Sequence, residues 1–267
     1  MSTRMPTFFI PHGAGPCFFM QWNPSDMWDS MGIFLSTLQE QLPQPVKAIV
    51  LISAHWITPH ACVNAQAKPG LIYDYYGFPE HTYALQYPAP GSPSLAQKIA
   101  QLLSQQGLEC ELEHSRGWDH GVFIPLKLIA PSAEIPVVQL SLVEGLDAAQ
   151  HLAIGAALEP LRDENVLIIG SGMSFHNMRA YGNPAFTPIA QTFDDWLTRT
   201  VVAAPKARHH ALLNWANAPG ARESHPLHQE EHLLPLMVVA GAAREGVGRP
   251  VFNDQVLEVA ISGFRFD

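Results

Sequence analysis

Blocks of apolar and polar residues follow one another along the chain, and their length and period predict strands and helices in turn. Short, almost wholly apolar runs are typical of strands covered on both faces, whereas apolar positions three or four residues apart are typical of helices packed on a sheet. We expect strands at residues 7–11, 46–54, 108–112, 135–142, 166–169 and 255–262. We expect helices at residues 26–42, 94–106, 148–162, 189–202, 206–216 and 226–243, and either a helix or a strand at 122–129.

The order of these elements predicts an α/β fold. Strands that alternate with helices of this length imply a central, mostly parallel or mixed sheet with helices on both faces. No Gly/Ser-rich linker, internal repeat or charge block interrupts the 267 residues, so we expect a single domain over residues 1–267. Residues 73–93 are rich in Tyr, Gly and Pro without a period, and we expect them to form a long ordered loop of the kind that is usually functional.

Composition narrows the class of protein. A hydrophobic fraction of 47% with 15% charged residues is typical of a globular chain, and the longest uncharged apolar run, near 233–243, is too short to span a bilayer. The net charge is −9 and the 15 Lys and Arg residues form no basic stripe, so nucleic acid is not an expected partner. The N-terminus lacks the apolar region of a secretory signal and the three cysteines form no CxxC pair, so we expect a cytoplasmic protein with free thiols.

Histidine is the unusual residue of this chain, with 13 copies against 15 Lys and Arg together. His12, His55 and His176 each follow a predicted strand, so all three should reach the edge of the sheet where α/β proteins bind ligands. Their wide spacing excludes a zinc-finger type of site, in which ligand pairs lie two to five residues apart. Imidazole suits Zn, Fe, Cu and Ni alike, and any one of these histidines could instead hydrogen-bond a loop carbonyl.

Glycines flank two of these strand-end histidines. Gly13 and Gly15 allow the sharp turn that an inward-facing histidine at position 12 needs, and we expect Gly170 and Gly172 to form the turn that aims His176. The second pair fits neither the G-x-S-x-G elbow of serine hydrolases nor a phosphate-binding loop.

A turn at Gly117-Trp-Asp-His-Gly121 presents a further candidate, His120. A histidine fixed on such a turn suits a general acid/base, whose orientation must be held. A capping or turn interaction of the Asp-His pair is the alternative interpretation.

The segment 224–232 contains three more histidines, which would share one face of a helix that begins near Pro226. We expect His225 and His228 in a solvated first turn, and His232, which precedes an apolar run, to face inward. The segment also matches the H-x-x-E-H pattern of zinc metallohydrolases. That interpretation needs a further ligand downstream and leaves the strand-end histidines unexplained.

Seven stretches of the chain, taken together, resemble the class III extradiol ring-cleavage dioxygenases of the 4,5-DOPA dioxygenase extradiol type. They run in family order over nearly the whole sequence. The stretches are Phe9-Ile-Pro-His-Gly-Ala-Gly-Pro16, Ser53-Ala-His-Trp56, Tyr87-Pro-Ala-Pro-Gly-Ser-Pro93, Gly117-Trp-Asp-His-Gly121, Pro136-Val-Val-Gln-Leu-Ser141, Gly170 to Asn177, and Glu231-His-Leu-Leu-Pro-Leu236.

The resemblance implies one mononuclear divalent metal, with Fe(II) expected for activity and Zn(II) as another form that could be bound. It implies that His12 and His55 are metal ligands, that His232 completes the site, and that His176 is a ligand or lies beside the ligands. It also implies that His120 is an acid/base residue outside the metal's ligand sphere.

This chain departs from the family pattern at two places. Ala14-Gly15 stands where the family's HGSP motif has its serine, and residues are inserted between the first two ligand histidines. The wider class completes its site with a carboxylate where His232 stands, so Glu231 is an alternative ligand.

The implied activity is the opening of a catechol-type ring, such as that of DOPA, with O2 to give a muconic semialdehyde. His120 or His176 would take the proton of a catechol hydroxyl and give a proton back as the ring opens. The alternatives are a non-catalytic or zinc-bound relative with the same fold and, further off, a zinc metallohydrolase. Four aromatic residues are either walls for the substrate ring or ordinary core residues: Trp56, Tyr75, Tyr76 and Phe78.

Overall fold

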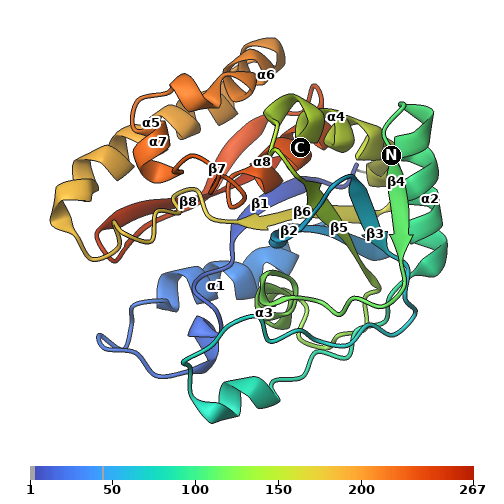
Figure 1. Cartoon of the computed structure of the whole chain (residues 1–267), viewed down its shortest axis with the longest axis horizontal. Helices are drawn as coiled ribbons and strands as arrows, with labels where there is room; N and C mark the ends of the chain where they lie inside the picture. Colours follow the sequence, from blue (N-terminus) through green and yellow to red (C-terminus); the bar gives the residue numbers. More distant parts are fainter. Residues whose placement is uncertain (1–3, 44) are drawn as a thin grey trace.

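The computed structural model describes residues 4–43 and 45–267, and the eight strands of this part of the chain form one mixed sheet (Figure 1). The strand order is β4-β3-β5-β2-β6-β1-β8-β7, and its four central strands, β5 to β1, are parallel to one another. The strands are β1 (Thr7–Pro11), β2 (Ala48–Thr58), β3 (Ala61–Asn64), β4 (Cys110–Glu113), β5 (Val137–Val143), β6 (Val166–Gly172), β7 (Gly248–Val256) and β8 (Val259–Phe266).

Helices cover both faces of the sheet. They are α1 (Asp29–Thr37), α2 (Pro93–Gln105), α3 (His120–Ile129), α4 (Ala148–Leu158), α5 (Thr187–Val202), α6 (Pro205–Leu213), α7 (Ala221–Ser224) and α8 (Leu234–Ala243). In Figure 1, α4, α8, α5 and α6 lie above the sheet and α2 stands at its right-hand side, whereas α1 and α3 lie below the sheet. Helix α2 packs against α4 and so belongs to the same layer. Two separate apolar clusters correspond to these two layers. The predicted fold class is therefore confirmed.

The central strands are continuous apolar runs because helices bury them on both faces. Every residue of β5 and β6 is buried, as are eight of the eleven residues of β2. The ambiguous segment 122–129 is helical, within α3, and residues 73–93 form the expected long loop apart from a short turn of 3-10 helix at Glu80–Ala84.

The predicted helix over residues 226–243 is wrong in its first half, because α8 begins only at Leu234. Pro226 biases the preceding His225 toward extended backbone, which has φ −132° and ψ 92°. His228 then adopts a positive φ of 64°, which a helix does not allow. The three histidines of this segment therefore do not share a helix face.

The predicted strand at 255–262 instead spans the turn of a β-hairpin and the first half of its second strand. β7 and β8 are antiparallel neighbours, and the two residues between them, Leu257 and Glu258, have positive φ values of 48° and 70°. Such turns usually carry Asn-Gly or Asp-Gly, so this sequence lacks the ordinary signal.

Two central strands run further than predicted and carry site residues with them. His55 lies within β2 rather than after it, and Gly170 and Gly172 lie within β6 rather than in a turn. A Cβ atom on Gly172 would stand 2.1 Å from the carbonyl oxygen of His232, and one on Gly170 would stand 2.5 Å from that of Pro235. These glycines therefore allow the backbone at His232 and in the first turn of α8 to approach the sheet.

Among the described residues, no helix is long and apolar enough to cross a membrane. Cys17, Cys62 and Cys110 are free, as predicted.

Candidate metal and active site

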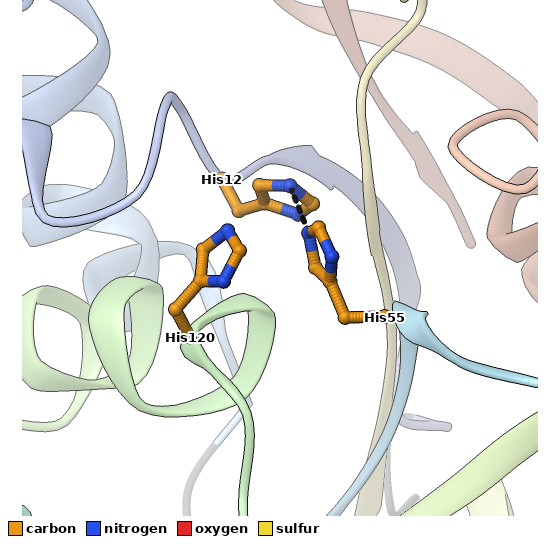
Figure 2. Close-up of side chains that lie close together, drawn as sticks. All are labelled: His12, His55 and His120. Atoms are coloured by element: carbon orange, nitrogen blue, oxygen red, sulfur yellow. Dashed lines mark hydrogen bonds between the residues drawn. The ribbon is translucent and has the colours of Figure 1, made fainter. Parts of the chain in front are cut away.

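Five histidines lie together at the carboxyl edge of the central strands. The Nε2 atoms of His12 and His55 are 3.2 Å apart, and the ring centroids of His55 and His120 are 4.0 Å apart (Figure 2). The rings of His176 and His232 stack with centroids 3.3 Å apart, and the ring of His232 lies 5.3 Å from that of His12. The structure thus brings every sequence-predicted site histidine to one place.

His12 enters the site from the end of β1. Gly13 and Gly15 have φ values of 78° and 52°, so the predicted turn after this histidine is confirmed. The hydroxyl of Ser171 donates to the carbonyl of Gly121 at 2.5 Å, which leaves its oxygen to accept a hydrogen bond from His12 Nδ1 at 3.1 Å. The Nε2 atom of His12 therefore carries the lone pair and faces the cluster.

An irregularity in β2 turns His55 into the site. Between Ile52 and Ile57, β2 advances five residues while its partner β5 advances only two, which is a bulge of the kind that re-aims side chains beside active sites. The backbone of His55 is fixed on both sides, because its N–H donates to Ser53 Oγ at 3.1 Å and its carbonyl accepts from Arg116 at 3.2 Å.

Asp119 links Ser53 and Arg116, the two residues that hold the backbone of His55. This fully buried carboxylate accepts hydrogen bonds from Ser53 Oγ, Gln139 Nε2 and Arg116 Nη2 at 2.6, 2.6 and 3.2 Å. A buried charge is tolerated when it is paired and its oxygens are hydrogen-bonded. Asp119 therefore positions His55 rather than facing the ligand itself.

His120 opens α3 and is oriented by Asp74, a residue of the long loop that sequence reasoning missed. Asp74 Oδ1 accepts from the backbone N–H of His120 at 2.8 Å and from its Nδ1 at 2.9 Å. Burial works to raise the pKa of Asp74, but the hydrogen bonds and charge of His120 outweigh it and lower the pKa. The only sequence signal was a single acid inside an aromatic loop.

His232 lies at the close approach between β6 and the segment before α8. Its carbonyl accepts from Met173 N at 3.0 Å, and its Nδ1 is 2.9 Å from Glu231 Oε1. The same carboxylate oxygen lies 3.8 Å from Nδ1 of His176. Burial raises the pKa of Glu231, whose carboxyl group thus lies next to both His176 and His232.

The two remaining histidines of this segment have different fates. His228 is exposed, as expected, and therefore does not form a metal pair with the buried His232. The expectation of a solvated position was wrong for His225, which is fully buried and lies 2.9 Å from the carbonyl of Ser174 through Nε2. Burial lowers the pKa of His225 to about 3.

The electrostatics of the cluster favour neutral imidazoles. Burial, with the positive charge that neighbouring histidines would add, lowers the pKa of His55 to about 3 and of His176 to about 4. Burial likewise holds the pKa of His12 and His232 well below the ordinary value.

Neutral ring nitrogens that converge on one place are the donor set of a divalent metal. His12, His55 and His120 offer ligand atoms within 4.8 Å of one another, as do His176, Glu231 and His232. Each cluster could thus supply ligands, and the donors fit the metal that the resemblance implies.

A cavity of about 260 Å³ opens on the histidines. Tyr75 and Phe78 line it, in agreement with the expected aromatic walls. Trp56 is instead a core residue, the other alternative, and lies buried under the Arg116 guanidinium. Tyr76 is neither a wall nor a core residue, because it is 91% exposed. The remaining lining residues are His12, Gly13, Ala14, Gly15, Trp28, His55, His120, Met173, His176, Met178, Tyr181, His232 and Leu257.

A third cluster of potential ligands lies elsewhere, at the edge of the sheet, and consists of His60, Cys62 and Glu111. His60 Nε2 forms a 2.8 Å ion pair with Glu111, whose side chain is 63% exposed. An ordinary surface ion pair accounts for this arrangement.

Comparison with known proteins agrees with the geometry. The family model described as "Catalytic LigB subunit of aromatic ring-opening dioxygenase" matches residues 6–264. The chain belongs to this family, and it is an enzyme of the extradiol ring-cleaving dioxygenase class.

Individual relatives are similar over most of their length. The chain is 37% identical to dioxygenase tasH of Hapsidospora irregularis, over 97% of this chain and 86% of that protein. It is 39% identical to the 4,5-DOPA dioxygenase extradiol of Beta vulgaris, over 90% and 87% of the two chains. The crystal structure of an uncharacterized protein from Escherichia coli K12 matches with a TM-score of 0.78 and 30% identity, over 99% of this chain and 100% of that one.

Proposed function

We propose that this enzyme opens the ring of a catechol with O2 to give a muconic semialdehyde, at one mononuclear metal, with Fe(II) as the active form. The observation that carries the proposal is the convergence of five buried or half-buried histidines on one cavity that Tyr75 and Phe78 also line. The single catalytic domain would be the whole chain, built on the one sheet.

His12, His55 and His232 are the proposed metal ligands. His12 and His232 each have Nδ1 hydrogen-bonded to a protein group, Ser171 or Glu231, which leaves Nε2 for the metal. Metal-bound histidines almost always have their second ring nitrogen engaged in this way. His120 competes for the third position, because it groups with His12 and His55 within 4.8 Å.

When bound, the metal supplies the positive charge that acidifies a catechol hydroxyl and the redox chemistry that ring opening with O2 requires. His120 takes the hydroxyl proton at Nε2, since Asp74 holds its Nδ1. His176, stacked on His232 and facing the same cavity, gives a proton to an oxygen atom derived from O2 as the ring opens, and both atoms of O2 stay in the product.

The proposal is tested by loading the protein with Fe(II) under anaerobic conditions and then supplying O2 with a panel of catechols. Oxygen uptake and a new absorbance band are the expected result. Protein that binds iron and consumes no oxygen with any catechol would contradict it. A Zn(II)-loaded sample is the matched control, because zinc has no redox chemistry and should be inert.

A further inference from the structure

The cavity above the histidines contains no cationic side chain other than histidine among its described lining residues. Lys and Arg are absent from that lining, which beyond the histidines consists of small and apolar or aromatic residues. The mouth is apolar too, because Met178 is 67% exposed there and Leu257 is 37% exposed. A substituent on the substrate ring would therefore meet hydrocarbon and sulfur.

The polar groups of the aromatic walls are already engaged. Tyr75 donates its hydroxyl to the carbonyl of Thr82 at 2.7 Å, and Tyr181 donates to the carbonyl of Phe175 at 2.9 Å. Trp28 Nε1 is the one side-chain donor of the described lining that is buried without a partner. One neutral N–H does not compensate a carboxylate for the loss of its hydration.

The charged groups around the cavity also disfavour an anionic substituent. Asp74 and Glu231 are the carboxyl groups in contact with the site histidines. Arg116, the cation bonded to the backbone of His55, is held by Asp119. The chain as a whole carries a net charge of −9. A carboxylate on the substrate would therefore find no Lys or Arg among the residues that line the cavity, whereas two acids contact the site histidines.

We infer that the substrate is a catechol with a short, uncharged and mainly apolar substituent, and that catechols bearing a carboxylate, amino acids included, are poor substrates. This inference rests on the proposed function and names the substrate class of the same site. The size of the cavity agrees with it, since about 260 Å³ lies below the roughly 300–1,000 Å³ of sites for drug-sized ligands. A single ring with a few carbon atoms fits this description.

A matched pair of substrates tests the inference, namely 4-propylcatechol and 3-(3,4-dihydroxyphenyl)propionate, which differ in the carboxylate at the end of the side chain. With the Fe(II)-loaded enzyme, we expect kcat/KM to be at least about 10-fold higher for the propyl compound, because the desolvated anion finds no partner. DOPA should behave like the propionate. An equal or higher kcat/KM for the propionate or for DOPA would overturn the inference while leaving ring cleavage in place.

Binding to the Zn(II)-loaded protein separates this inference from the proposed function. The dissociation constants of both compounds follow from the quenching of tryptophan fluorescence, with Trp28→Phe identifying the signal that comes from the cavity wall. Tighter binding of the propyl compound supports the inference even if no catechol is cleaved. Absence of cleavage would contradict the proposed function and leave the inference about binding in place. Tighter binding of the propionate overturns the inference.

A charge placed at the mouth gives the sharpest control. Met178 is exposed, so Met178→Lys should fold, and Met178→Gln is the polar but uncharged match. We expect the lysine variant to shift the kcat/KM ratio about 5- to 10-fold toward the propionate, as one partly exposed charge pair would. The glutamine variant should leave the ratio unchanged. An equal shift in both variants, or none in the lysine variant, would contradict an uncompensated anion as the cause of selectivity.

Discussion

At three of the five site histidines, one ring nitrogen is hydrogen-bonded to a residue outside the histidine cluster: His12 to Ser171, His120 to Asp74 and His232 to Glu231. Such bonds fix the ring and leave its other nitrogen for the site. The histidines themselves could be predicted, because strand ends and glycine turns are visible in the sequence. Their partners could not, since Asp74 lies 46 residues from His120 and its contact exists only after folding.

The division of roles among the histidines predicts graded effects of substitution. His12→Ala and His55→Ala should lose the metal, because each removes an Nε2 donor at the centre of the cluster. His120→Ala should retain the metal and lose turnover by about 10²- to 10⁴-fold, the usual contribution of a general acid/base. Metal analysis by mass spectrometry beside steady-state assays measures both. Equal metal loss in all three variants would make His120 a ligand instead.

Asp74 is a positioning residue for His120, so Asp74→Asn should lower kcat by about 10-fold while KM and metal content stay unchanged. The amide keeps an acceptor for Nδ1 and removes the charge. Asp195→Asn, an exposed change on α5, is the control and should leave kcat unchanged. A rise in KM or a loss of metal in Asp74→Asn would show a role in binding rather than in proton transfer.

At the scale of elements, the glycines of the Gly-Ser-Gly stretch in β6 allow the backbone of His232 and Pro235 to pack closely against the strand. The sequence suggested a turn, because Ser-Gly dipeptides and closely spaced glycines often mark turns. The structure has a strand instead, since the backbone at His232 and Pro235 packs where the glycines have no Cβ. This contact between β6 and the distant backbone of His232 and Pro235 cannot be predicted from the local sequence pattern. The same holds for the late start of α8 and for the β7–β8 turn.

Gly172→Ala tests this close approach. The new Cβ would lie 2.1 Å from the backbone oxygen of His232, so the segment before α8 must shift. We expect a loss of about 1–3 kcal/mol in the free energy of unfolding, as for other overpacked sites, together with weaker metal binding. Urea unfolding and metal titration measure the two effects. Gly70→Ala, with no atom within 4 Å of the added Cβ, should change neither; equal effects in both variants would refute the explanation.

For the whole molecule, the arrangement of one sheet between two helical layers followed from the alternation of apolar runs and amphipathic segments. The folded molecule buries several histidine side chains, and this burial keeps their imidazole rings neutral. Burial lowers the pKa values of His55, His176 and His225 to about 3, 4 and 3. In the unfolded chain these groups take up protons below about pH 6.5.

Acid should therefore destabilise the metal-free protein. Because unfolding binds protons between the two pKa values, the stability is full above about pH 6.5 and falls as the pH drops, by up to about 1.4 kcal/mol per pH unit for each such histidine. Urea unfolding from pH 8 to pH 5 measures the slope. His225→Gln removes one titrating group outside the site and should reduce the slope. A stability that is flat or rises toward pH 5 would contradict neutral buried histidines.

The central claim is that the histidine cluster would hold a metal at which O2 opens a catechol ring between a hydroxyl-bearing carbon and its neighbour without a hydroxyl. Its most direct test is product analysis for the Fe(II)-loaded enzyme with an alkylcatechol, combined with oxygen uptake in the same vessel. We predict one O2 consumed per catechol and a product with the aldehyde proton signal of a muconic semialdehyde. A dicarboxylic product, or bound iron with no consumption of oxygen, would contradict the claim.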